Sequence, residues 1–329
     1  MKYLFVLFII AGLIWSALGD GRGRGENGQA DNNQGDEDGR IPPGQAKKHP
    51  PHPKKTSTTT TTTTTTTTPT TTPTTIPTTL RPTTPMIRKE CKNDHKSVCL
   101  QLSNKCAFTI WPGIQGPDNP EQGGLKIDAG QIYNLTVPKG WAGGKIWART
   151  GCDRHYNCET GQCKNSLQCN GYGGKAPYTE VDITLAASVG ADDTYSVSLE
   201  NGYNIQMTVE PIKESCQEHG GDYDCKKAGQ CNKDVNTICP QELQEKNKMG
   251  TVVGCNSACS KYNTDYYCCR GAYGNQYKCK PKQWPVNYPG IFKGVCPTDK
   301  TYTFDDKTDM FKCRGKRGIP SASYLITFC

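Results

Sequence analysis

The placement of cysteine constrains this chain more than any other feature of its sequence. All nineteen cysteines lie between residues 91 and 329, and the first ninety residues contain none. Such a density is typical of a disulfide framework, which persists in oxidising compartments and is lost in the reducing cytosol. We therefore expect residues 91–329 to form the folded part and the protein to be extracellular.

The N-terminus has the features of a secretory signal peptide over residues 1–19. Lys2 supplies the positive start, residues 3–15 are almost wholly apolar, and Ala17 and Gly19 are the small residues that cleavage requires. The apolar run is shorter than the roughly 20 residues of a membrane-spanning helix, which disfavours the alternative of an uncleaved anchor. The sequence thus predicts a secreted protein with no transmembrane segment after cleavage.

Two segments of biased composition separate this signal from the cysteine-rich part. Residues 20–55 hold Gly, Asn, Gln and mixed charge with little apolar surface to bury, so we expect disorder there. Residues 56–90 are mostly threonine with interspersed proline, the composition of an O-glycosylated mucin-like stalk. An unglycosylated, flexible spacer is the alternative.

The charge of the chain argues against a nucleic-acid-binding protein. The formal net charge is +8, and the first ninety residues hold about half of it, so residues 91–329 are only mildly basic. No cluster of Lys and Arg interleaved with aromatic residues is present. No phosphate loop or dinucleotide fingerprint appears either, and we predict no cofactor.

Residues 91–212 have the alternating pattern of short β-strands. The segments with this pattern are residues 107–111, 132–137, 145–149, 179–185, 195–199 and 203–209. Asn201-Gly202 suits a type I′ turn and predicts a hairpin between the last two segments. Many short strands with turn signals between them favour an all-β antiparallel sandwich.

Beyond residue 216 the strand pattern fades and the cysteines lie closer together. This change predicts a disulfide-rich lobe of loops and short helices, with helices near residues 240–247 and 256–262. The terminal Cys329 predicts a small C-terminal region tied back onto the sandwich by a disulfide.

Several stretches resemble the thaumatin-like proteins, the pathogenesis-related 5 type, over roughly residues 98–329. The matching stretches, in chain order, are GKIWARTGC at 144–152, CETGQC at 158–163, LQCNGYG at 167–173, NGYNIQM at 201–207, Cys231 to Cys239-Pro240, DYYCC at 265–269, FKGVCP at 292–297 and YLITFC at 324–329. Their number and order make the resemblance strong, and the Thr-rich stalk lies outside it.

The resemblance implies a disulfide pattern. The implied pairs are Cys106–Cys329, Cys152–Cys158, Cys163–Cys169, Cys231–Cys296, Cys239–Cys255, Cys259–Cys268 and Cys269–Cys279, with Cys313 joined to Cys225 or Cys216. Spacing from Cys231 favours Cys225 as the partner of Cys313. Cys91, Cys99 and Cys216 then remain, so one cysteine is a free thiol or forms a disulfide-linked dimer. Export and this pairing both oppose a zinc site among the clustered cysteines, and we predict no metal.

The resemblance also implies a polar cleft that binds β-1,3-glucan and is associated with antifungal defence. The cleft residues it implies here are Arg149, Asp182, Ser196, Asn201 and Asp234. Ser196 and Asn201 stand at positions that are acidic in the family, and Asp182 stands at a glutamate position. The cleft is therefore less acidic than the family pattern, although Glu180 shares the strand face of Asp182.

Three functions follow as hypotheses. The first is a secreted defence protein that binds microbial cell-wall polysaccharide, and the second is an extracellular structural or adhesive protein whose stalk is the working part. The third is a weak endo-β-1,3-glucanase with Asp182, Asp234 and Glu180 as candidate carboxyl groups, since glycoside hydrolysis uses two. A structural interpretation competes at each position: Arg149 as an ion-pair partner of Asp182 or Asp234, and Asn201 as a turn residue. Asn134, in Asn134-Leu135-Thr136, is a candidate N-glycan site.

Overall fold

The computed structural model describes residues 91, 93–305 and 311–329. The strands are β1 Ser97–Asn104, β2 Trp111–Gln115, β3 Ile132–Pro138, β4 Gly144–Arg149, β5 Glu180–Thr184, β6 Asp192–Ser198, β7 Met207–Pro211, β8 Cys216–Gln217, β9 Gln244–Lys246, β10 Val252–Cys255, β11 Phe311–Gly315 and β12 Tyr324–Phe328. The α-helices are α1 Ala258–Tyr262, α2 Asp265–Cys268 and α3 Tyr288–Lys293. Short 3-10 turns are η1 Pro120–Gly123, η2 Lys213–Ser215, η3 Val235–Ile238, η4 Gln241–Leu243, η5 Gly271–Tyr273 and η6 Pro281–Gln283. The predicted signal, disordered segment and stalk lie outside the described residues.

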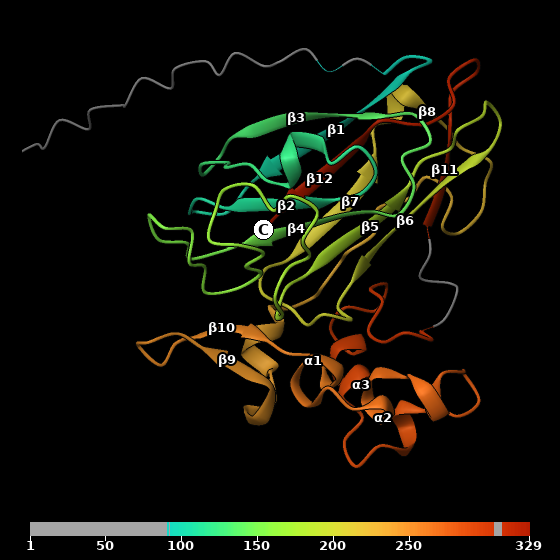
Figure 1. The fold of residues 1–329 in the computed structure, drawn as a ribbon. Helices are drawn as coiled ribbons and strands as arrows, with labels where there is room; N and C mark the ends of the chain where they lie inside the picture. The colour runs from blue at the N-terminus through green and yellow to red at the C-terminus, as the bar shows by residue number, and fades with distance from the viewer. Residues whose placement is uncertain (1–90, 92, 306–310) are drawn as a thin grey trace, which may run out of the picture. The chain divides into compact units, whose positions relative to one another are not determined.

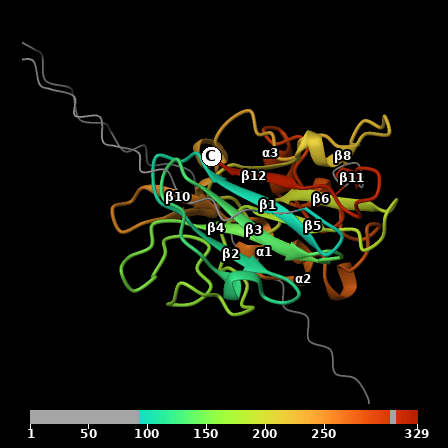
Figure 2. The ribbon, with the colours of Figure 1, turned by 90° about the horizontal axis from the view of Figure 1, so that it is seen from above.

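Two sheets form a sandwich, as the sequence predicted (Figure 1; Figure 2 gives the view from above). One sheet has the strand order β3-β1-β12-β7, and the other has the order β2-β4-β5-β6-β11-β8. All neighbouring strands are antiparallel except β1 and β12, which run parallel. The prediction of an all-β, mainly antiparallel fold is confirmed.

The sandwich core is built from the alternate residues of each strand. In β5, Val181 and Ile183 are buried in the core, while Asp182 between them is half-buried on the other face. This arrangement is the period of two that a pleated strand imposes on its side chains. The outer face of the six-stranded sheet is therefore free to carry polar groups.

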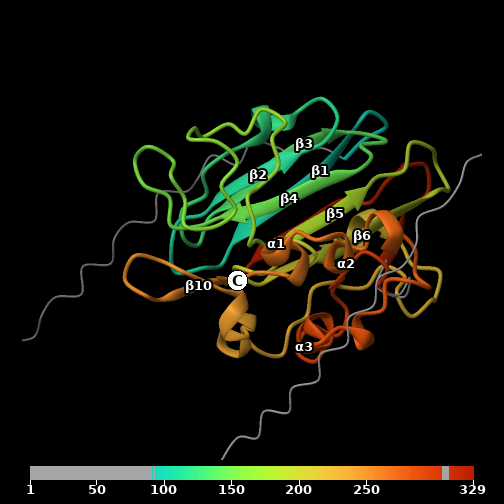
Figure 3. The ribbon, with the colours of Figure 1, turned by 60° about the horizontal axis from the view of Figure 1, so that its bottom comes forward.

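The lobe consists of β9, β10 and the short helices, drawn in orange and turned toward the viewer in Figure 3. It has a core of its own, in which Leu243, Trp284 and Phe292 pack around disulfide-bonded cysteines. Backbone hydrogen bonds connect it to the sheet where β6 ends, since Leu199 N donates to Lys300 O and Lys300 N donates to Val197 O. These hydrogen bonds attach the lobe to the end of β6, which is the neighbour of β5 in the six-stranded sheet.

Nine disulfides cross-link the described residues. The structure contains the eight bridges that the resemblance implied, with Cys313 joined to Cys225. A ninth bridge joins Cys91 to Cys99, and Cys216 keeps a free thiol. Cys106–Cys329 closes a separation of 223 residues and ties the last strand to the start of the sandwich. Disulfides this numerous fit an extracellular protein.

The hairpin predicted at Asn201-Gly202 is wrong. β6 pairs with β5 and β11 in the six-stranded sheet, whereas β7 pairs with β12 in the other sheet. Gly202 has a positive φ of 93°, but Asn201 does not, so the turn is not type I′. Here the chain passes from one sheet to the other, and Tyr203 bridges to Cys255 of the lobe.

Two other predicted boundaries were wrong. The strand expected at residues 107–111 begins at Trp111 and ends at Gln115. It contains Pro112 and Gly113, which are uncommon in strands and interrupt the alternating pattern. Gly113 lies opposite Trp147, and a Cβ there would come within 2.3 Å of the indole. The helix expected at residues 240–247 is the turn η4 followed by β9, while α1 confirms the helix expected near residues 256–262.

No helix among the described residues is long and apolar enough to cross a membrane.

Candidate functional site

Three charged side chains meet on the outer face of the six-stranded sheet. β4 and β5 are antiparallel neighbours, and their register places Lys145 opposite Asp182 and Trp147 opposite Glu180. Lys145 Nζ lies 2.5 Å from Glu180 Oε1 and 2.7 Å from Asp182 Oδ1. We call Lys145, Glu180 and Asp182 the charged cluster.

The three groups of the charged cluster have different environments. The side chain of Glu180 is 3% exposed, whereas that of Asp182 is 33% exposed. Burial, assisted by the neighbouring charge of Asp182, raises the pKa of Glu180 to about 7, although Lys145 acts in the opposite direction. Burial alone would lower the pKa of Lys145, but the two carboxylates outweigh it and raise that pKa. Asp182 is thus the accessible anion of the cluster, and Glu180 is a buried acid.

Two of the predicted cleft residues adjoin this cluster. Ser196 of β6 lies opposite Asp182 in the sheet register and is buried. Asn201 accepts a hydrogen bond from Tyr178 N at its backbone oxygen, which places it near the cluster's edge. It also lines a separate small cavity of about 120 Å³ together with lobe residues such as Trp284.

Arg149 is a structural residue in this fold. It is fully buried, and its guanidinium donates to the backbone oxygens of Trp111 at 2.8 Å, Ser166 at 2.9 Å and Leu167 at 2.6 Å. Burial lowers its pKa to about 10. Among the described residues it forms no ion pair, so the alternative interpretation of an ion pair with Asp182 or Asp234 is wrong. Its buried guanidinium also does not join the other residues of the predicted polar cleft. Backbone carbonyls of β2 and of the loop at Ser166 and Leu167 accept the hydrogen bonds that a carboxylate would have accepted.

Asp234 also lies apart from the charged cluster. It is the N-cap of η3, where it accepts a hydrogen bond from Asn236 N at 3.0 Å, and it accepts another from the hydroxyl of Tyr203. The five residues predicted for one cleft therefore occupy different places: Asp182 and Ser196 stand together, Asn201 borders them, and Arg149 and Asp234 do not join them.

Lys145 was missed at the sequence level. Its place in an alternating strand puts it on the face of Trp147 and Arg149, but nothing in that strand identifies its partners across the sheet. The pairing of β4 with β5 brings these partners next to Lys145. Lys145 and Glu180 are 35 residues apart in the sequence.

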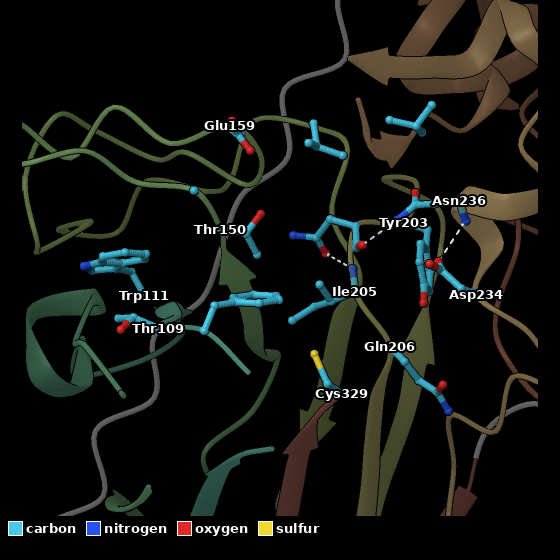
Figure 4. Close-up of a pocket in the computed structure, with 15 residues that line it drawn as sticks. Thr109, Trp111, Thr150, Glu159, Tyr203, Ile205, Gln206, Asp234, Asn236 and Cys329 are labelled. Carbon is cyan, nitrogen blue, oxygen red and sulfur yellow. Dashed lines mark hydrogen bonds between the residues drawn. The ribbon is translucent and has the colours of Figure 1, made fainter. Parts of the chain in front are cut away.

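Asp234 lines a second hollow, shown in Figure 4. This cavity of about 660 Å³ is formed by the segment before β2, the loops after β4 and β6, η3 and β10. Its lining residues are Phe108, Thr109, Trp111, Thr150, Gly151, Glu159, Tyr203, Asn204, Ile205, Gln206, Asp234, Asn236, Val252, Val253 and Cys329. We call it the aromatic pocket, after Phe108, Trp111 and Tyr203.

The folded part of the chain matches known plant proteins over most of their length. The Thaumatin family matches residues 104–329. A thaumatin-like protein of Arabidopsis thaliana is 41% identical over 234 residues, which span 69% of this chain and 87% of the relative. Pathogenesis-related protein 5 of the same plant is also 41% identical, over 69% of this chain and 88% of its own length. A glucan endo-1,3-beta-glucosidase of Prunus avium is 36% identical over 71% of this chain and 91% of its own length.

Proposed function

The chain belongs to the thaumatin family, and from that membership we propose that it is a secreted defence protein which binds β-1,3-glucan of microbial cell walls through the charged cluster. A pathogenesis-related protein and a protein named as a glucan endo-1,3-beta-glucosidase among its relatives support the class of function and of ligand.

The observation that carries the proposal is the Lys145 bridge between two carboxylates on an outer sheet face. Lys145 holds Asp182 by one oxygen, and a third of the Asp182 side chain is exposed. A carboxylate fixed in this way can accept hydrogen bonds from a pair of sugar hydroxyls with little further loss of side-chain entropy. Binding of an uncharged polysaccharide is therefore the chemistry that the cluster supports.

The same geometry argues against efficient hydrolysis. A glycosidase places two carboxyl groups on either side of the scissile bond, one of them as a proton donor. Here both carboxylates bind the same ammonium group, and Glu180, which has the raised pKa of a proton donor, is almost completely buried. A glycosidic oxygen would have to compete with the ammonium group of Lys145 for Glu180.

Retention on insoluble β-1,3-glucan, measured together with release of reducing sugar, tests the proposal. Asp182→Asn removes the accessible charge and the ion pair with Lys145, and we expect retention to fall several-fold with no sugar released by either protein. Asp128→Asn is the matched control, because Asp128 forms a comparable ion pair with Lys126 at 2.9 Å and is about half exposed. Equal retention of wild type and Asp182→Asn would refute the site, and lack of retention by the wild type would favour the adhesive alternative. Sugar release by the wild type would favour the glucanase.

A further inference from the structure

The aromatic pocket is a second place where this chain offers binding chemistry. It is formed by residues that do not belong to the charged cluster, and Figure 4 shows Trp111 and Asp234 on opposite sides of it, with Glu159 and Thr150 on one edge and Gln206 on another. Its volume of about 660 Å³ lies within the range of small-molecule sites.

The pocket presents aromatic surface to solvent. Phe108 is 46% exposed, and Trp111, which lines the same cavity, is partly exposed. The other tryptophans of the described chain, Trp141, Trp147 and Trp284, are at most 5% exposed. Exposed rings that line one cavity provide a flat apolar platform on which a ring-shaped ligand can stack.

The pocket also presents hydrogen-bonding groups that have no partner. Among the described residues, the side chains of Glu159 and Gln206 form no hydrogen bond or ion pair, and both residues line the cavity. An apolar ligand would remove these groups from water without replacing their hydrogen bonds, which is costly for an amide and more so for a carboxylate. A ligand with several hydroxyl groups would satisfy them.

The negative charge of the pocket disfavours an anionic ligand. Glu159 and Asp234 are both acidic, and none of the residues described above as lining the pocket is basic. Lys246 and Lys248 line the neighbouring groove that shares Glu159, so positive charges near the pocket partly offset its acidic residues. An uncharged ligand fits this mixture best.

From stacking surface, unpaired hydrogen-bonding groups and the balance of charge together, we propose that the aromatic pocket binds a neutral oligosaccharide, with a sugar ring stacked on Phe108 and Trp111 and its hydroxyl groups bonded to Glu159 and Gln206. This site is separate from the charged cluster and does not depend on the function proposed there. It would hold a few sugar units of a soluble chain or a chain end.

Calorimetric titration of the full-length protein with soluble trisaccharides of glucose, either β-1,3-linked, β-1,4-linked or α-1,4-linked, tests the proposal. We expect saturable binding of at least one of them, accompanied by a change in tryptophan fluorescence, because Trp111 is the accessible indole of the described chain. Phe108→Ala should weaken this binding about tenfold, which corresponds to about 1.4 kcal/mol. Gln206→Leu, which keeps the side-chain size and removes the amide, should weaken it several-fold.

Two controls establish whether the binding belongs to the aromatic pocket. Tyr277→Ala removes a ring that is 76% exposed but lies outside the pocket, and it should leave trisaccharide binding unchanged. Asp182→Asn should reduce retention on insoluble glucan without affecting the change in tryptophan fluorescence that a trisaccharide causes at Trp111, so either proposal can fail alone. Absence of binding by every trisaccharide, or binding unaffected by Phe108→Ala and Gln206→Leu, would overturn the assignment. Binding of a hexyl glycoside but of no free trisaccharide would overturn it in favour of an apolar ligand.

Discussion

Replacing Glu180 by glutamine should change how the stability of the protein depends on pH. The folded protein raises the pKa of Glu180 to about 7, from the ordinary value of 4.5, because the group is buried beside Asp182. Between these two values the folded state holds a proton that the unfolded state has released. The free energy of unfolding therefore falls as pH rises through this window, and the contribution of Glu180 is complete only below about pH 4.5.

The size of the effect follows from the difference between the two pKa values. Each pH unit of that difference is worth about 1.4 kcal/mol, so the loss is on the order of 3 kcal/mol between pH 4.5 and pH 7.5. The glutamine amide of Glu180→Gln does not titrate, so the wild type should lose this amount relative to the variant over that range. Because the comparison is a difference between two proteins, the contributions of carboxyl groups outside the charged cluster cancel, including that of Asp193, whose pKa burial also raises.

Denaturant unfolding at a series of pH values, with the disulfides intact and followed by tryptophan fluorescence, measures this difference. Glu214→Gln is the control, since Glu214 is an exposed glutamate outside the charged cluster. If the difference between wild type and Glu180→Gln stayed constant from about pH 4.5 to about 7.5, the buried acid in the charged cluster would be wrongly assigned.

Four further predictions follow from the structure and the sequence. Arg149→Met should lower the free energy of unfolding by on the order of 3 kcal/mol, because it leaves several buried carbonyl oxygens unpaired; a loss below about 1 kcal/mol in denaturant unfolding would contradict this role. Gly113→Ala should lower the free energy of unfolding by about 2 kcal/mol in the same assay, since its Cβ would lie 2.3 Å from the Trp147 ring. An unchanged unfolding midpoint would show that β2 and Trp147 can move apart at no cost in stability. Alkylation of the unfolded, unreduced protein should label one thiol, Cys216, and intact mass showing none or more than one would mean different disulfides. Enzymatic removal of O-glycans should increase electrophoretic mobility, with residues 56–84 as the modified segment, and unchanged mobility would exclude a glycosylated stalk.

The sequence identifies the sandwich strands where the side chains alternate and fails where pairing is remote. β3, β4 and β5 follow their alternating patterns closely because one face of each strand packs into the sandwich core. The predicted hairpin failed because β6 pairs with β11, whose residues lie more than a hundred positions later, and this gain outweighs a favourable local turn. Local turn chemistry cannot report a partner that distant.

At the candidate site, too, the sequence predicts which face of a strand a residue occupies but not its partners on the neighbouring strand. Alternation alone places Glu180 and Asp182 on one face of β5. It cannot supply Lys145, because the cation comes from β4 through the cross-strand register. Alternation also places Arg149 on the outer face of β4. Loop residues near Ser166 and Leu167 cover that end of the strand. A charged residue on the correct face of a strand is thus a site residue only where no loop covers it.

Disulfides explain why such loops can cover one end of a strand and leave the other end open. The loop that holds the guanidinium of Arg149 lies between Cys163 and Cys169, which are bonded to each other, so its carbonyl oxygens are fixed without a large apolar core beneath them. The disulfide keeps this loop closed in the unfolded chain as well, so folding does not have to supply the chain entropy of closing it. Toward the other end of β4, Lys145 keeps 39% of its side chain exposed. The cysteine spacing, which was the strongest feature of the sequence, therefore also fixes the loop that covers one end of β4.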